Sequence, residues 1–166
     1  MNRMQVQKTR QTSNFNMAEP FFTKAEHKQV TNAIGEAERN TSGEIRVHIE
    51  SLCREDVLDR AAFIFKKLEM HKTELRNGVL FYLSIEDHKL AILGDAGINA
   101  KVQKGFWTEI KDFLIAEFRA GKYAQGLSEE IIKAGAQLKQ HFPYQKDDVN
   151  ELSNDISFGD KMKGNE

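Results

Sequence analysis

Three short stretches of the sequence place an oxygen-bearing side chain beside a glycine. They are Ser42-Gly43-Glu44, Asn77-Gly78 and Gly94-Asp95. Carboxylate, amide, hydroxyl and backbone carbonyl oxygens are the ligands that hard cations such as Ca²⁺ and Mg²⁺ prefer. Glycine has no Cβ and therefore lets backbones and ligands approach closely. If the three stretches meet, they form an oxygen-rich site whose metal ligands would be Glu44, Asn77 and Asp95.

The apolar pattern around these stretches predicts strands that share one edge of a sheet. Residues 44–50 alternate apolar and polar side chains, which is typical of a half-buried strand. Residues 78–83 are apolar without alternation, as in a central strand, and residues 90–94 follow a short polar turn as the third strand. A right-handed crossover makes the first two strands parallel, and the hairpin makes the third antiparallel to both. The turn places Val79 opposite Gly94 and Gly78 opposite Asp95.

Helical periodicity predicts four helices around this sheet. Their apolar stripes run through residues 23–39, 57–68, 98–118 and 123–138. Thr23 and Glu26 fit a capping box, Gly121 is the expected stop of the third helix, and Pro143 ends the fourth. The element order is therefore α-β-α-β-β-α-α. It predicts a three-layer or partly open α/β sandwich around a small mixed sheet.

The proposed ligands also have an ordinary structural explanation. Glycines at strand ends mark turns, Asn77 precedes a glycine as in many tight turns, and Asp95 could cap the next helix. For a cation site, we expect Ser42, His71 and Glu74 to lie around the ligands. Structural zinc is excluded because the chain has one cysteine and its histidines lack ligand spacing.

Composition indicates a soluble globular protein. The chain has 166 residues, 40% hydrophobic and 30% charged, with a net charge of −1. Basic residues are interspersed with acidic ones, so no nucleic acid partner is expected. No apolar run approaches the roughly 20 residues of a membrane span, and residues 1–16 lack the apolar core of a secretory signal. With Cys53 as the lone cysteine, these features favour a cytoplasmic protein without a membrane anchor.

The chain is expected to divide into three parts. The sequence predicts a disordered arm at residues 1–16, the α/β domain at residues 17–143, and an acidic and polar tail at residues 144–166. The tail contains Leu152, Ile156 and Phe158, which either dock on the domain or remain exposed.

The common phosphatase nucleophiles are missing from the sequence. A cysteine-dependent phosphatase needs an arginine six positions after the cysteine, whereas Asp59 stands at that distance from Cys53. An Asp-x-Asp nucleophile motif and a Walker loop are also absent. Hydrolysis would therefore have to be metal-assisted, with Glu44 or Asp95 holding the ion. Glu74 or His71 would then take the proton.

The chain resembles the TPM domain family over about residues 20–143. The resemblance is carried by "TSGEIRVHIE" (41–50), "RNGVLFYLSIEDHKLAILGDAGI" (76–98) and "FRAGKYAQGLSEEI" (118–131), and it is strongest to short, soluble bacterial members. It implies an α/β/α sandwich. Some members are reported as acid phosphatases, others assist photosystem repair or modulate a receptor, and divalent cations are associated with the domain. The resemblance thus favours Glu44, Asn77 and Asp95 as the cation site.

Two functions from different classes follow. The first is Ca²⁺ or Mg²⁺ binding at the glycine-rich edge, with metal-dependent phosphoester hydrolysis as a further step. The second is a non-catalytic adaptor whose tails recruit a protein partner.

Overall fold

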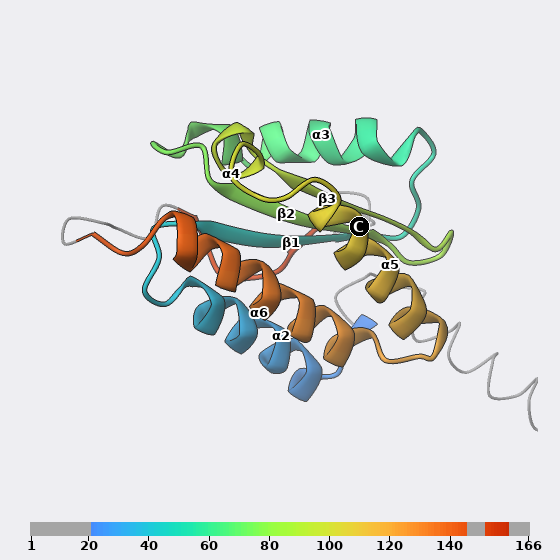
Figure 1. The fold of residues 1–166 in the computed structure, drawn as a ribbon. Helices are drawn as coiled ribbons and strands as arrows, with labels where there is room; N and C mark the ends of the chain where they lie inside the picture. The colour runs from blue at the N-terminus through green and yellow to red at the C-terminus, as the bar shows by residue number, and fades with distance from the viewer. Residues whose placement is uncertain (1–20, 146–151, 160–166) are drawn as a thin grey trace, which may run out of the picture.

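A computed structural model describes residues 21–145 and 152–159, which form a mixed sheet covered by helices on both faces (Figure 1). The sheet has the strand order β3-β2-β1-β4. In chain order the elements are α2 (Lys24–Glu38), β1 (Glu44–Glu50), α3 (Val57–Lys67), the 3₁₀ helix η2 (Met70–Lys72), β2 (Gly78–Ser84), β3 (Lys89–Gly94), α4 (Ala96–Asn99), α5 (Phe106–Arg119), α6 (Tyr123–His141) and β4 (Ser157–Phe158).

The pairing of the first three strands confirms the predicted topology. β1 and β2 are parallel, with Glu44 opposite Gly78, and β2 and β3 are antiparallel, with Val79 opposite Gly94. The backbone N–H of Asp95 donates to the carbonyl oxygen of Gly78 at 2.9 Å, which continues the hairpin register by one residue. The amino ends of β1 and β2 and the carboxyl end of β3 therefore lie at one edge.

The helices complete the α/β/α sandwich that the sequence predicts. α2, α5 and α6 cover one face of the sheet, and α3 covers the other (Figure 1). The main core lies on the first face and includes Ile45, Val47 and Ile49 of β1. A smaller core lies beneath α3 around Leu80 and Tyr82 of β2. β2 is buried along its whole length, as expected of a central strand.

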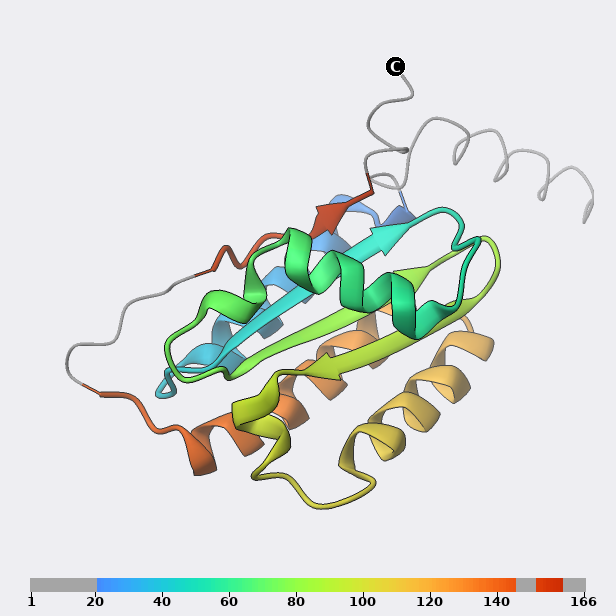
Figure 2. The ribbon, with the colours of Figure 1, turned by 90° about the horizontal axis from the view of Figure 1, so that it is seen from above.

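A fourth strand joins the sheet from the C-terminal part of the chain. β4 runs parallel to β1, with Ser157 opposite His48 and Phe158 opposite Ile49 (Figure 2). Ile156 is buried in the main core. We call residues 152–159 the C-terminal strap. The sequence left open whether the apolar residues of the tail dock on the domain or remain exposed, and the strap is docked. The predicted disordered arm at residues 1–16 lies outside the described residues.

One predicted helix proves to be two. The apolar stripe from residue 98 to residue 118 is divided between α4 and α5, so the prediction of a continuous helix was wrong. Gly105, directly before α5, has a φ of 88°, a left-handed conformation that interrupts helical geometry. Within the described residues, no helix is both long enough and apolar enough to cross a membrane.

The polar face of β1 is also more buried than its alternating pattern predicts. Glu44, His48 and Glu50 are all buried, although half-buried strands usually turn such side chains to water. α3 lies over this face, and the strap pairs with the open side of β1 (Figure 2). Charged side chains on β1 therefore need partners within the protein.

Candidate functional site

The structure brings the three predicted ligands to the same edge of the sheet. Glu44 donates its backbone N–H to the carbonyl oxygen of Asn77 at 3.4 Å, and Asp95 donates to Gly78 at 2.9 Å. Glu44 and Asp95 thus flank Gly78 from opposite sides. At a strand spacing of about 4.8 Å, their backbones are about 10 Å apart. The edge forms as expected, but its two carboxylates come from strands that are not neighbours.

Asp95 already has a cationic partner. Its Oδ2 accepts a hydrogen bond from Nε of Arg76 at 2.7 Å, and its Oδ1 accepts one from Nη2 at 2.8 Å. Oδ1 also caps α4 by accepting from the N–H of Ala96 at 2.8 Å. Hydrogen bonding to Asp95 raises the pKa of the Arg76 guanidinium, which favours its charged form. The capping role that the sequence left open for Asp95 is therefore present.

Glu44 and Asn77 are more deeply enclosed. Glu44 is 2% exposed, and its Oε1 accepts a hydrogen bond from the backbone N–H of Leu152 in the strap at 3.3 Å. Asn77 is 1% exposed, and its Nδ2 donates to Oγ of Ser42 at 3.3 Å. The Oδ1 atom of Asn77 is buried without a hydrogen-bond partner in the described structure. A buried acceptor of this kind is uncommon and is suited to an ion or a water molecule.

A cavity of about 350 Å³ lies beside Glu44 and is also lined by Glu38, Arg39, Asn40, Thr41 and Tyr144. Oε2 of Glu38 accepts a hydrogen bond from the backbone N–H of Ile45 at 2.7 Å. Burial raises the pKa of Glu38 to about 8, and the negative charge of Glu44 acts in the same direction. The hydrogen bond from Ile45 and the positive charge of Arg46 lower this pKa and offset part of the rise. This carboxylate pair therefore favours a proton or a cation beside it.

Sequence reasoning missed Glu38. It is the last residue of α2 and follows no motif, and its only signal is its place shortly before the turn that leads into β1. The Glu38 carboxylate can bind the backbone N–H of Ile45 because this N–H points away from β2 and is not used in the pairing of the two strands.

His71 and Glu74 are not joined to the predicted ligands. Nδ1 of His71 is buried and has no hydrogen-bond partner among the described residues, and Glu74 is exposed. Across residues 21–145 and 152–159, no three His, Cys, Asp or Glu side chains gather closely enough to hold a metal ion. A cation at this edge would need amide oxygens, backbone carbonyls or water in addition to carboxylates.

Two of the three glycines at the edge serve internal packing. A Cβ on Gly43 would lie 2.6 Å from a methyl carbon of Leu138, and one on Gly94 would lie 2.8 Å from both Asn99 and Trp107. Gly78 would make only ordinary contacts with Met70. The close approach that the sequence suggested for a ligand is therefore used by side chains of the protein itself.

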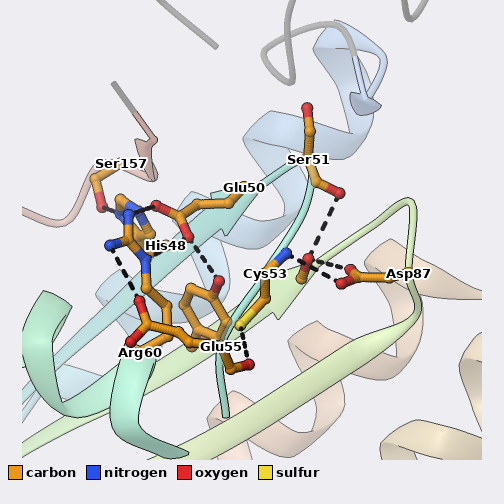
Figure 3. A network of polar contacts seen from close by, with 10 residues as sticks. His48, Glu50, Ser51, Cys53, Glu55, Arg60, Asp87 and Ser157 are labelled. Carbon is orange, nitrogen blue, oxygen red and sulfur yellow. Dashed lines mark hydrogen bonds and ion pairs between the residues drawn. The ribbon is translucent and has the colours of Figure 1, made fainter. Parts of the chain in front are cut away.

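A second polar cluster lies at the other end of β1 and is centred on Glu50 (Figure 3). Glu50 accepts hydrogen bonds from the hydroxyl of Tyr82 at 2.6 Å and from Nε and Nη2 of Arg60 at 2.9 and 2.6 Å. Nε2 of His48 lies 3.4 Å from its Oε2. Burial opposes ionisation of Glu50, but these hydrogen bonds outweigh it and hold its pKa well below the ordinary range. The polar alternation of residues 44–50 was the sequence signal for this cluster.

The cluster around Glu50 joins three parts of the fold. Nδ1 of His48 lies 2.7 Å from Oγ of Ser157 in the strap, while Arg60 belongs to α3 (Figure 3). Cys53 is buried nearby, and its Sγ donates to the carbonyl oxygen of Glu55 at 3.2 Å. Because these groups satisfy one another, the cluster is built to hold elements together. Cys53 is thus part of the smaller core beneath α3.

Comparisons with known proteins identify the fold. The family model of the TPM domain matches residues 16–137. The NMR structure of the BA42 protein from the psychrophilic bacterium Bizionia argentinensis is similar with a TM-score of 0.78 and 47% sequence identity, covering 85% of this chain and 97% of that one. The NMR structure of the N-terminal domain of a P. gingivalis protein shares the fold at a TM-score of 0.63 and 19% identity, covering 76% and 83% of the two chains. Comparison with curated proteins gives no match.

Proposed function

We propose that this chain, which belongs to the TPM domain family, binds a divalent cation, Ca²⁺ or Mg²⁺, where β1 and β2 begin. Glu44 and Asn77 would be ligands, as the sequence predicts, and Glu38 would be the second carboxylate. Asp95 would join them only after leaving Arg76. The observation that carries the proposal is the Glu38–Glu44 pair beside a cavity of about 350 Å³, where the pKa of Glu38 is raised to about 8.

The donor set fits a partly hydrated ion. Mg²⁺ is commonly held by one or two carboxylates and keeps several water molecules, whereas Ca²⁺ takes six to eight oxygen ligands from side chains, carbonyls and water. Glu38 and Glu44 line the cavity and would supply two carboxylates. Asn77 does not line it, so its unpartnered Oδ1 would supply a neutral oxygen only to an ion that lies toward the start of β2. With so few charged ligands we expect weak binding, with a Kd of about 10⁻⁴ to 10⁻³ M.

The proposal is tested by NMR titration of the ¹⁵N-labelled protein with CaCl₂ and, separately, MgCl₂. Saturable shifts of the Gly43, Asn77 and Gly78 amides are expected in the wild type. E44Q, which keeps the size of the side chain but removes its charge, should abolish them. E86Q changes an exposed glutamate in the hairpin turn and should behave like the wild type. Equal titrations of E44Q and the wild type would overturn the site.

The role of Asp95 is tested separately by D95N. If Asp95 stays with Arg76, D95N leaves cation affinity unchanged and only weakens the cap of α4. If Asp95 is a ligand, D95N lowers the affinity as E44Q does. R76A then provides the opposite test, because it frees the Asp95 carboxylate and would raise the affinity.

Phosphoester hydrolysis is the second step of the proposal, and it rests on the family resemblance. A bound cation would polarise a phosphoryl oxygen and activate water. Glu38 is better placed than His71 or Glu74 to exchange a proton there, because it lines the cavity and has a pKa of about 8. Hydrolysis of p-nitrophenyl phosphate that requires Mg²⁺ and disappears in both E44Q and E38Q would support it. Cation binding without turnover would leave a regulatory or structural role for the ion.

The adaptor alternative is favoured by one observation. The strap pairs with His48 and Ile49 on the open side of β1, and strand pairing is a common way for a sheet edge to bind a peptide. Removing residues 144–166 would therefore expose the outer backbone groups of β1 and also delete any contact that the tail makes with a partner. If a partner protein binds more tightly after this truncation, its binding site is the exposed side of β1. If the partner no longer binds, its binding site is the tail.

A further inference from the structure

A second cavity, of about 460 Å³, lies at the opposite end of the sheet from Glu44. It is formed by the end of β2, the hairpin turn, the start of β3 and the corner between α5 and α6, with Leu83, Lys89, Ile115 and Tyr123 among its lining residues. Its volume falls within the range of about 300 to 1,000 Å³ that is typical of small-molecule sites. Open α/β sheets usually bind ligands beyond the carboxyl ends of their strands, and this cavity lies at the carboxyl end of β2.

The charged groups around this cavity are basic. Lys89 and Arg119 line it together with His88, and no acidic side chain of the described chain does so. Lys89 is partly neutralised, because its Nζ lies 3.7 Å from Asp87 and donates to the carbonyl oxygen of Cys53 at 3.0 Å. Arg119 is exposed and forms no ion pair with any described residue. The cavity thus presents about one uncompensated positive charge.

The remainder of the lining is mainly apolar. Leu90, Ile115 and Phe118 are only partly buried and contribute to the wall. The rings of Phe118 and Tyr123 lie 4.9 Å apart and form an aromatic corner. The positive end of α6 and the negative end of α5 meet at this corner and offset one another, so the charge of the cavity comes from its side chains.

We propose that this cavity binds an amphipathic carboxylate: a small molecule with one negative charge and an apolar chain or ring. Arg119 receives the carboxylate, with His88 as a further hydrogen-bond donor, and the apolar body lies against Ile115, Phe118 and Tyr123. One net positive charge matches a monoanion better than a phosphate dianion, and the apolar wall removes the body of the ligand from water. This site is separate from the cation site, because the two lie at opposite ends of the sheet.

Sodium decanoate is the probe, used below its micelle concentration in buffer with EDTA so that divalent cations have no part. Amide NMR of the full chain should show saturable shifts of Leu90, Ile115, Arg119 and Tyr123, with little change at Gly43 or Asn77. Acetate, which has the charge without the chain, and decanol, which has the chain without the charge, should each bind at least tenfold more weakly.

Two charge reversals decide the role of Arg119. R119E changes an exposed side chain at the end of α5 and should raise the Kd for decanoate at least tenfold. K66E makes the same change on α3, across the sheet, and should leave the Kd unchanged. Equal affinities of R119E and the wild type, equal binding of decanol and decanoate, or the absence of saturable shifts would each overturn the proposal.

Discussion

Arg60 holds the carboxylate of Glu50 at two points, with Nε at 2.9 Å from Oε1 and Nη2 at 2.6 Å from Oε2. The two residues belong to different layers, since Arg60 lies in the first turns of α3 and Glu50 ends β1. The carboxylate side chain is 7% exposed and the guanidinium side chain 27%. The pair therefore joins a helix to the sheet through a charge that water can scarcely reach.

Removing Arg60 should destabilise the protein strongly. Among the described residues, R60A leaves the buried Glu50 charge with Tyr82 and His48 as its side-chain partners, and breaking a buried pair in this way costs about 3 to 5 kcal/mol. We expect a value near the lower limit, because Arg60 is partly exposed. R54A, at an exposed arginine, should change the free energy of unfolding by less than about 0.5 kcal/mol in the same urea titration. Similar effects of the two variants would contradict a structural role for the pair.

Glu38 should make the protein less stable as the pH rises. Its pKa is about 8 in the folded chain, against about 4.3 for an unfolded glutamate, so the folded state holds more protons between these values. The free energy of unfolding then falls as the pH increases through this interval, by less than about 1.4 kcal/mol per unit for one proton. E38Q should remove this contribution and keep an oxygen for the N–H of Ile45.

The measurement for Glu38 is urea unfolding at pH 5, 6.5 and 8 in metal-free buffer. E36Q is the matched control on the same helix, because Glu36 is 48% exposed and pairs with Arg39 at the surface. It should retain the pH dependence of the wild type. If E38Q also retains it, Glu38 does not have the raised pKa.

Two glycine-to-alanine variants should have opposite effects. A Cβ on Gly97 would lie 2.1 Å from the carbonyl oxygen of Leu75, so G97A must displace the loop that carries Arg76 and should cost about 1 to 3 kcal/mol. Gly35 lies inside α2 with open space around its Cβ position, so G35A should stabilise the protein by about 0.5 to 1 kcal/mol. Thermal unfolding followed by circular dichroism compares them, and a stabilised G97A would refute the close contact.

Shortening Ile156 should loosen the strap without unfolding the domain. Ile156 is 5% exposed in the main core, and its truncation to alanine costs about 2 kcal/mol or more. I156A should therefore speed amide hydrogen exchange at Gly159, whose N–H donates to the carbonyl oxygen of Ile49 at 3.0 Å. I132A, at a residue 40% exposed on α6, should leave exchange at Gly159 unchanged. Unchanged exchange in I156A would mean that the strap is held by its polar contacts alone.

The sheet of β1, β2 and β3 could be predicted because each step depended on local information. The alternation of residues 44–50 and the apolar run after Gly78 identified two strands, and the helix between them required a parallel crossover. The hairpin turn was short enough to determine the register of Val79 and Gly94. The edge that collects Glu44, Asn77 and Asp95 followed from these steps.

The side-chain contacts around Glu44, Asn77 and Asp95 could not be predicted, because they depend on backbone geometry that produces no recognisable pattern in the sequence. Arg76 has a φ of 54° and forms an ion pair with Asp95, although nothing in the sequence distinguishes it from any other residue before a turn. Glu38 reaches Ile45 across a turn. The residues of β4 are too few to show an alternation, and they meet β1 across more than a hundred positions. Long-range pairing of this kind is decided by the assembled core and not by the local sequence.

The place of the strap in the chain has a consequence for synthesis on the ribosome. β4 follows every other helix and strand of the structure in sequence, so β1 emerges and pairs with β2 long before its second neighbour exists. During that interval the outward-facing backbone groups of Val47 and Ile49 resemble an unprotected sheet edge, which other chains can join. A nascent or prematurely terminated chain is therefore the form most exposed to aggregation, and arrival of the strap ends that exposure.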